Sequence, residues 1–390
     1  IFCYRLFLER PHLLSMIALP LAFLFLVKGK NFWLFILSFF YALSYDLAPL
    51  IILPALVYSA TEAYVNKRIN LRPLIAAASG ILFGILVHPA SLNYCYVIFV
   101  QLWQTLFLKF TGIDLGIGNE TQLMNFSGFV FSNFLVLLFY VAAVVLFLAL
   151  KKIDKNLIIS NFLFLYSGFW FLITLLVPRG VEFWLPPAFL FIALTFSNFL
   201  GTTEFNQIRH WLRDRINLKA LSFFLISLVF LIIFNNLSNV FFPIYQTKKN
   251  LDYQDFEQAN FWLKNHTKKD SIIFYNNWGL WPLMFFYNDY NHYIIGIDPT
   301  FLYEYDHKLF WLWKNISYYG WYCDRQELCL EISPRDNAKL IKTALKEKFQ
   351  AHYILLINNQ EQPLTKFLQS RKKDFLKVFE NEKVLIYELR

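Results

Sequence analysis

The sequence predicts an α-helical polytopic membrane domain of about eight spans followed by a small extracytoplasmic α/β domain. Two observations support this fold class. Residues 1–243 are long apolar runs separated by short basic loops, whereas residues 244–390 have the mixed pattern of a water-soluble domain. In addition, 57% of the residues are hydrophobic and only 16% are charged, compared with about 25% charged residues in ordinary soluble domains.

The apolar runs define the predicted spans. A bilayer core of about 30 Å needs about 20 apolar residues per helix. Runs that reach or approach this length lie at 12–27, 31–45, 47–64, 73–88, 129–150, 157–177, 183–200 and 220–240. The aromatic segment 91–109 fits either a further crossing or a helix that lies along the interface.

Basic residues predict the sidedness. Alternate loops hold twelve Lys and Arg residues, whereas the intervening loops and the start hold four. The positive-inside rule makes the basic loops cytoplasmic, so the C-terminal domain is predicted to be extracytoplasmic in a plasma-membrane protein. The basic loops contain Lys28, Lys30, Lys67, Arg68, Arg72, Lys151, Lys152, Lys155, Arg209, Arg213, Arg215 and Lys219. Because so much of the net charge of +9 acts as a topology signal, nucleic acid is not expected as a partner.

The pattern after residue 250 alternates between helices and strands. Helices are predicted at 252–266, 281–287, 309–316 and 334–349. Strands are predicted at 270–275, 293–297 and 353–357, with a closing hairpin of 375–380 and 384–389. This alternation predicts a small, mainly parallel sheet with an antiparallel edge.

Cysteines and motifs limit the chemistry. Cys3 and Cys95 lie in apolar surroundings, whereas Cys323 and Cys329 are six residues apart and either form a loop-stapling disulfide or remain free thiols. No metal-binding spacing, G-x-G-x-x-G or P-loop sequence is present, so neither a metal site nor nucleotide chemistry is predicted. No cofactor is certain, and a divalent cation is left open.

Several polar residues gather at the predicted outer boundary of the membrane domain. These are Glu9, Arg10, His88, Glu120, Arg179 and Glu182. The structural interpretation is that Arg179 and Glu182 neutralise each other and that His88 caps a helix. The functional interpretation is an outward cavity in which arginines hold a lipid-linked phosphate and carboxylates contact sugar hydroxyls. Asp46, on the same side, is either a solvated turn residue or part of this site.

The soluble domain offers a second group of candidates where its first two strands end. Asn277 and Trp278 follow the strand 270–275, and Asp298 follows the strand 293–297. Ligands of α/β folds usually bind at such strand ends. The alternatives are a tryptophan pair that packs the domain onto the membrane face, and an Asp298 that caps the next helix.

The order of these motifs resembles a known family. Glu9-Arg10-Pro11-His12, His88-Pro89, Gly118-Asn119-Glu120, Arg179-Gly180-Val181-Glu182-Phe183 and Ile295-Gly296-Ile297-Asp298-Pro299-Thr300 together resemble bacterial GT-C-type polytopic membrane glycosyltransferases. The segment Asn276-Asn277-Trp278-Gly279-Leu280-Trp281 is faintly similar to the WWDYG region of oligosaccharyltransferase catalytic subunits, but it lacks the aspartate. GT-C-type glycosyltransferases use polyprenyl-phosphate-linked sugars as donors.

The resemblance implies a glycosyltransferase-like protein of the hexosyltransferase type, with a polyprenyl-phosphate-linked sugar and membrane lipid as partners. It also places the catalytic acid in the first outer loop, upstream of Ile1, so the chain is interpreted as N-terminally truncated and its catalytic residue is unknown. Two alternatives stay open. One is a transporter or flippase of lipid-linked precursors, and the other is a non-catalytic membrane-anchored binding module.

Overall fold

A computed structural model of the chain describes residues 12–104, 108, 111–116, 125–150, 157–202, 205, 253–296 and 298–390, and six single positions between 223 and 237. The chain divides into two compact units, a helical unit of Ile1–Lys109 and Gly118–Ile244 and a second unit of Phe110–Ile117 and Tyr245–Arg390. Residues 110–117, which the sequence predicted to be part of the membrane domain, belong to the second unit.

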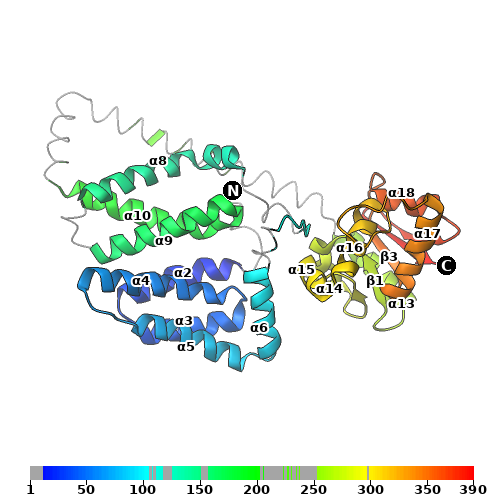
Figure 1. The fold of residues 1–390 in the computed structure, drawn as a ribbon, viewed down its shortest axis with the longest axis horizontal. Helices are drawn as coiled ribbons and strands as arrows, with labels where there is room; N and C mark the ends of the chain where they lie inside the picture. Colours follow the sequence, from blue (N-terminus) through cyan, green and yellow to red (C-terminus); the bar gives the residue numbers. More distant parts are fainter. Residues whose placement is uncertain are drawn as a thin grey trace. The chain divides into compact units, whose positions relative to one another are not determined.

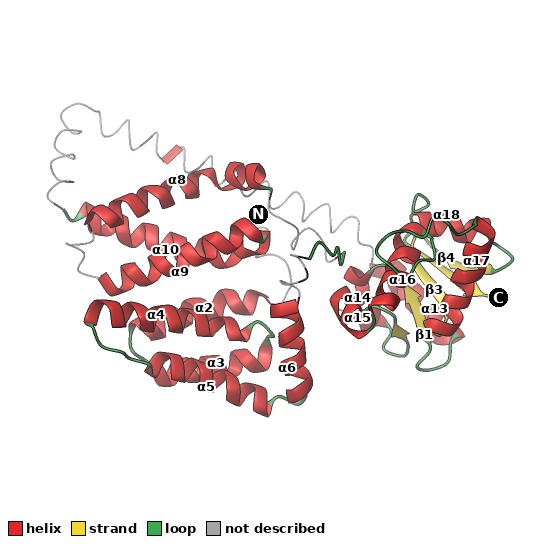
Figure 2. Ribbon diagram, in the orientation of Figure 1, coloured by secondary structure: helices red, strands yellow, loops and turns green. Residues whose placement is uncertain are grey.

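The described part of the helical unit consists of apolar helices (Figures 1 and 2). Proline starts several of them, as expected for a residue that needs no backbone N–H in the first helical turn. In chain order the elements are α2 (His12–Val27), α3 (Asn31–Ser44), η1 (Ala48–Ile51), α4 (Ile52–Asn66), α5 (Arg72–Val87), α6 (Ser91–Phe99), the π-helical turn η2 (Val100–Gln104), α8 (Phe126–Leu150), α9 (Leu157–Leu176), η3 (Pro178–Gly180) and α10 (Val181–Leu200).

Four stretches of described helix are long and apolar enough to cross a membrane, namely Ala48–Asn66, Phe126–Ala149, Leu157–Leu176 and Pro178–Leu200. Shorter apolar helices cover Leu13–Val27, Asn31–Ser44, Arg72–Val87 and Ser91–Leu102. The predicted span at 220–240 lies almost wholly outside the described residues. The helical unit therefore has the composition of a membrane domain, and length supports four crossings among the described residues. The other predicted spans stay predictions.

Two glycines bring α3 and α5 into close contact. A Cβ atom on Gly84 would lie 2.7 Å from both the Ala42 Cβ and the Phe39 carbonyl oxygen, and one on Gly80 would collide with the Phe35 carbonyl oxygen. Small residues four apart allow such backbone approach between membrane helices. Because the contacts advance in the same direction along both helices, α3 and α5 are parallel, and residues that follow the two helices lie at the same end of the unit.

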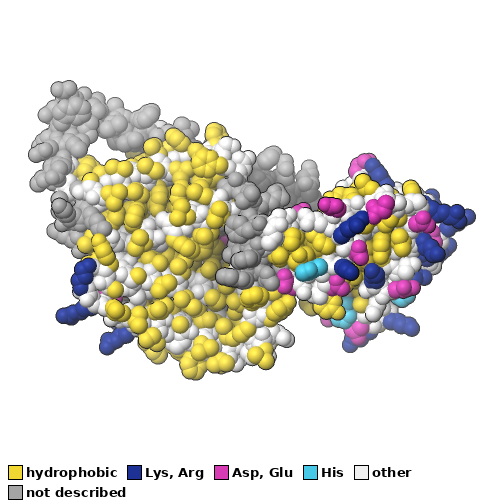
Figure 3. Space-filling model, viewed as in Figure 1, with side chains coloured by type: hydrophobic (Ala, Val, Ile, Leu, Met, Phe, Trp, Pro, Cys, Tyr) yellow, Lys and Arg dark blue, Asp and Glu magenta, His cyan; other side chains and the backbone are white. Residues whose placement is uncertain are grey.

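The opposite end of these two helices is basic. Lys28, Lys30, Lys67, Arg68 and Arg72 lie in or beside the connections that precede α3 and α5, and all five are exposed. Figure 3 shows a largely hydrophobic surface on the helical unit, with Lys and Arg side chains gathered at one end. We call these five residues the basic end.

The second unit contains a five-stranded sheet in the order β2-β1-β3-β5-β4. Figure 2 shows the strands in yellow among the helices of this unit. Its strands are β1 (Ile272–Tyr275), β2 (His292–Tyr293), β3 (Ala351–Ile357), β4 (Phe375–Glu380) and β5 (Val384–Leu389). β1 pairs in parallel with β2 and β3, whereas β5 pairs antiparallel with β3 and β4. The prediction of a mainly parallel sheet is therefore corrected to an evenly mixed one. The second strand is also shorter than predicted.

Helices cover both faces of this sheet. Ile273 and Tyr275 of β1 pack against one helix, α13 (Tyr253–His266), whereas Phe274 between them points to the other face and contacts Phe349. On that second face the Trp313 indole donates to the Tyr275 carbonyl at 2.9 Å. The remaining elements are η4 (Trp278–Leu280), α14 (Trp281–Tyr287), α15 (Pro299–Tyr305), α16 (His307–Tyr319), α17 (Pro334–Thr343), η5 (Ala344–Lys348) and α18 (Pro363–Ser370).

Cys323 and Cys329 form a disulfide, the first of the two alternatives that their spacing left open. The disulfide closes the connection that follows α16. The Asn315 side-chain amide also donates to the Cys323 carbonyl at 2.9 Å, which ties the same connection to the helix.

Candidate functional site

The connection between α3 and η1 holds Asp46 at the end of the helical unit opposite the basic end. Tyr45 ends α3 in an extended conformation, and its backbone N–H still bonds to the Tyr41 carbonyl. Pro49 then starts the next helical turn. The chain therefore turns within three residues, which leaves the Asp46 side chain half-buried.

Arg179 reaches this connection from a distant part of the chain. It lies in the η3 turn between α9 and α10, and its Nη2 donates to the Tyr45 hydroxyl at 3.3 Å across 134 residues of sequence. Gly180 fixes the turn, because a Cβ there would lie 2.9 Å from the Thr174 backbone nitrogen. Arg179 is half-buried, and its Nε makes no hydrogen bond within the described residues.

The charges of Asp46 and Arg179 act on each other. Burial raises the pKa of the Asp46 carboxyl above its ordinary value, and the Arg179 guanidinium opposes this shift without cancelling it. The effect of desolvation on the pKa of Asp46 is therefore larger than the opposing effect of the Arg179 charge. Carboxyls whose pKa is shifted by burial and by a neighbouring charge occur at functional sites and also in structural ion-pair networks.

His88 joins the same end through Tyr94. It is the C-cap residue of α5, as its structural interpretation predicted, and its Nδ1 accepts from the Ala90 backbone N–H at 3.2 Å. Its ring stacks on Tyr94 with a centroid distance of 4.3 Å, and the Asp46 charge acts on the Tyr94 hydroxyl. We call Tyr45, Asp46, His88, Tyr94 and Arg179 the Asp46 cluster.

Glu182 lies next to this cluster in sequence, in the first turn of α10. Its side chain is only 1% exposed. A carboxylate at this position interacts favourably with the N-terminal end of the helix dipole. The predicted site residues Glu9, Arg10 and Glu120 lie outside the described residues.

The predicted residues of the second unit lie at one edge of its sheet. Because β1 and β2 are parallel, Asn277 and Asp298 follow strands that end at the same edge. Both side chains cap helical turns. Asn277 accepts from the Gly279 backbone N–H at 3.1 Å, and Asp298 accepts from the Thr300 backbone N–H at 2.8 Å. The capping alternative for Asp298 is thus confirmed.

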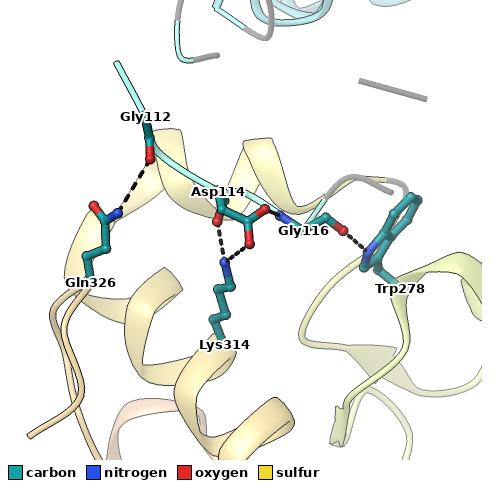
Figure 4. Close-up of polar contacts among 6 residues, drawn as sticks. All are labelled: Gly112, Asp114, Gly116, Trp278, Lys314 and Gln326. Carbon is teal, nitrogen blue, oxygen red and sulfur yellow. Dashed lines mark hydrogen bonds and ion pairs between the residues drawn. The ribbon is translucent and has the colours of Figure 1, made fainter. Parts of the chain in front are cut away.

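Trp278 binds a segment that the sequence analysis did not connect with it. Its indole Nε1 donates to the Gly116 carbonyl at 3.1 Å (Figure 4). Residues 111–116, which we call the strap, form part of the second unit although they precede α8 in the chain. Gly112 and Gly116 have φ values of 73° and 69°, a conformation that favours glycine.

Asp114 and Lys314 hold the centre of the strap. The Lys314 Nζ donates to the Asp114 Oδ2 at 2.9 Å and also to its backbone carbonyl. Partial burial acts to raise the pKa of Asp114, but hydrogen bonds from Lys314 and the Gly116 N–H outweigh it and keep the pKa below its ordinary value. Gln326 adds a contact to the Gly112 carbonyl at 3.5 Å (Figure 4). These contacts anchor the strap by charge and by backbone recognition.

Among the described residues no group of three or more His, Cys, Asp or Glu side chains is arranged to hold a metal ion. The Asp46 cluster instead offers a guanidinium, a carboxyl, an imidazole and two phenol groups. Two of its members, Tyr45 and Tyr94, were not predicted as site residues. Their only signal in the sequence was proximity to Asp46 and His88.

No protein-family model matches this sequence, and no curated protein matches it.

Proposed function

We propose that this protein is a membrane glycosyltransferase-like enzyme of the hexosyltransferase type. It would transfer a sugar from a polyprenyl-phosphate-linked donor to an acceptor on the outer face of the plasma membrane. The observation that carries the proposal is that Arg179 donates to the hydroxyl of Tyr45, the neighbour of Asp46, and that its charge acts on the Asp46 carboxyl. Two connections far apart in sequence thereby contribute to one end of an apolar helical unit.

Each group has a role in the proposed reaction. Arg179 binds the donor phosphate, because a guanidinium fork matches phosphate oxygens. Asp46 accepts the proton of the acceptor hydroxyl, whose oxygen attacks the anomeric carbon with inversion. The bond between that carbon and the phosphate oxygen breaks, and its electron pair leaves with the polyprenyl phosphate. Arg179 then stabilises the added negative charge.

The raised pKa of Asp46 suits this role. A general base works best when its pKa approaches the operating pH, and burial moves the Asp46 carboxyl in that direction. We assign the role to Asp46 because it is a half-buried carboxyl beside the proposed phosphate ligand.

Two features support the outer face. The exposed Lys and Arg residues of the basic end lie at the opposite ends of α3 and α5 from Asp46 and His88, and positively charged loops favour the cytoplasmic side. The disulfide between Cys323 and Cys329 fits an oxidising compartment. Both features are consistent with an extracytoplasmic second unit.

Arg179 provides the test. The full-length protein would be reconstituted in liposomes with a labelled polyprenyl-phosphate hexose, and release of polyprenyl phosphate would be measured for Arg179→Ala, Arg179→Lys and the control Arg68→Ala. We expect Arg179→Ala to fold but to lose donor binding and turnover, and Arg179→Lys to retain part of both, since lysine keeps the charge but loses the fork. Arg68→Ala, at the exposed basic end, should match the wild type.

Unchanged turnover in Arg179→Ala would contradict the proposed role. Movement of intact donor across the bilayer, with no release of polyprenyl phosphate, would favour a transporter or flippase instead.

A further inference from the structure

The solvent-exposed side of α14 in the second unit is aromatic, whereas the solvent-exposed side of a surface helix is normally polar. Met284 is fully buried beneath this helix. On the outside, the exposed fraction is 50% for Phe285 and 78% for Phe286. An amphipathic surface helix places charged or polar residues on its solvent side, but Trp281–Tyr287 contains no charged residue. This surface is therefore suited to contact something other than water.

The aromatic side chains form a defined surface. Trp281 stacks on Phe285 with a centroid distance of 5.1 Å. Together with Pro282, Phe286 and Asp289 they line an open hollow of about 590 Å³. At its rim, Asp289 pairs with Lys264 at 3.3 Å. We call Trp281, Pro282, Phe285 and Phe286 the aromatic face.

The strap contacts the segment just before the aromatic face, and a short stretch of chain connects the strap to helix α8. Gly116 accepts from Trp278, which is three residues before Trp281. Nine residues lie between Gly116 and Phe126 at the start of α8, and fully extended these ten residue steps span at most about 36 Å. Because α8 is long and apolar enough to cross a membrane, a crossing by α8 would keep the contact at Trp278 within this distance of the start of the helix.

We infer that the aromatic face of α14 lies in the headgroup region of the lipid bilayer that holds the helical unit. Tryptophan and phenylalanine are favoured at this depth, where apolar faces are buried by about 5–10 Å at the boundary between headgroups and acyl chains. The Lys264–Asp289 pair stays at the polar rim, within reach of headgroups. Tethering makes a small aromatic face sufficient, because the short connection between Gly116 and α8 keeps the local concentration of bilayer high. This inference does not depend on the enzymatic proposal.

A depth measurement tests this contact in the full-length protein. Cys3 and Cys95 would be replaced by serine, and Phe286→Cys labelled with a bimane fluorophore in liposomes. Lys372→Cys is the matched control, because Lys372 is exposed in the connection between α18 and β4 of the same unit. Quenching would be compared for iodide in water and for phosphatidylcholine that carries a nitroxide near its carbonyl groups.

We expect the label at position 286 to be quenched by the lipid nitroxide and shielded from iodide, and the label at position 372 to show the reverse. Equal iodide quenching at both positions would overturn the inference. Shielding at position 286 without lipid quenching would also overturn it, since it would mean that protein covers the face, either the helical unit or a second copy of the chain.

Discussion

The two ends of the helical unit differ in how they hold charge. The basic end carries five exposed Lys and Arg side chains. The Asp46 cluster instead has a half-buried carboxyl, Asp46, and a half-buried guanidinium, Arg179, whose charges are opposite in sign to each other. Both ends belong to the same helices, since α3 begins beside Lys30 and ends beside Asp46, about 21 Å further along the helix axis. Exposed charge at a membrane boundary directs topology, whereas partly desolvated charge is retained where it has a structural or chemical role.

Close packing of α3 on α5 places Asp46 and His88 at one end, so disrupting it should have the largest effect on stability. We expect Gly84→Ala to reduce the free energy of unfolding by about 1–3 kcal/mol, because its Cβ would meet Ala42 and the Phe39 carbonyl at 2.7 Å. The control is Gly201→Ala, whose Cβ would meet no atom closer than 3.5 Å. Thermal unfolding of the purified variants would measure the difference, and equal melting temperatures would contradict the packing.

Loss of the hydrogen bond between Tyr45 and Arg179 should have a smaller effect. Tyr45→Phe removes the hydroxyl that accepts from Arg179 but keeps the ring. We expect turnover to fall by about tenfold, near the lower end of the effect of losing a hydrogen bond to a charged group, which contributes about 1.5–3 kcal/mol. The loss stays at the lower end because Arg179 keeps its attraction to Asp46. The assay is donor turnover at saturating acceptor. A loss as large as that of Arg179→Ala would mean that Tyr45 itself contacts the substrate.

Substitution at the basic end should have the smallest effect. We expect Lys30→Ala to change the free energy of unfolding by less than about 0.5 kcal/mol, because Lys30 is exposed. Turnover should be unchanged in molecules that retain the wild-type orientation. Orientation would be determined by protease protection, and turnover by the same donor assay. A large loss of turnover in molecules that keep the wild-type membrane orientation would contradict this account, because it would give the basic end a functional role.

Local features were predictable from the sequence, and contacts between distant segments were not. Apolar runs predicted α2 at the same bounds, and the position of Asp298 before Pro299 indicated its helix cap. The short α18 was not predicted. Of the eight predicted spans, three correspond to apolar helices shorter than 18 residues and one falls largely outside the described residues, so these four stay predictions.

The candidate site depended on tertiary contacts that no local pattern encodes. Arg179 and Asp46 were each recognised as charges at a boundary, but their proximity follows from how α9 and α10 pack near the end of α3. The strap was missed for the same reason, since the pairing of Asp114 with Lys314 joins positions 200 residues apart. Pairs of opposite charge that are far apart in sequence can be recognised only once the tertiary structure is known.

The pH profile of donor turnover, compared between wild type, Asp46→Glu and Asp46→Asn, tests the central claim most directly. The proposed base acts as a carboxylate, so wild-type turnover should rise with pH through the pKa of Asp46, which burial raises above the ordinary value of 3.8. Asp46→Asn, which keeps the shape but cannot accept a proton, should bind donor and lose turnover by about 100-fold or more. Asp46→Glu should retain part of the activity together with an acidic limb. Wild-type turnover and an unchanged pH profile in Asp46→Asn would contradict the claim that the Asp46 cluster is the site of chemistry.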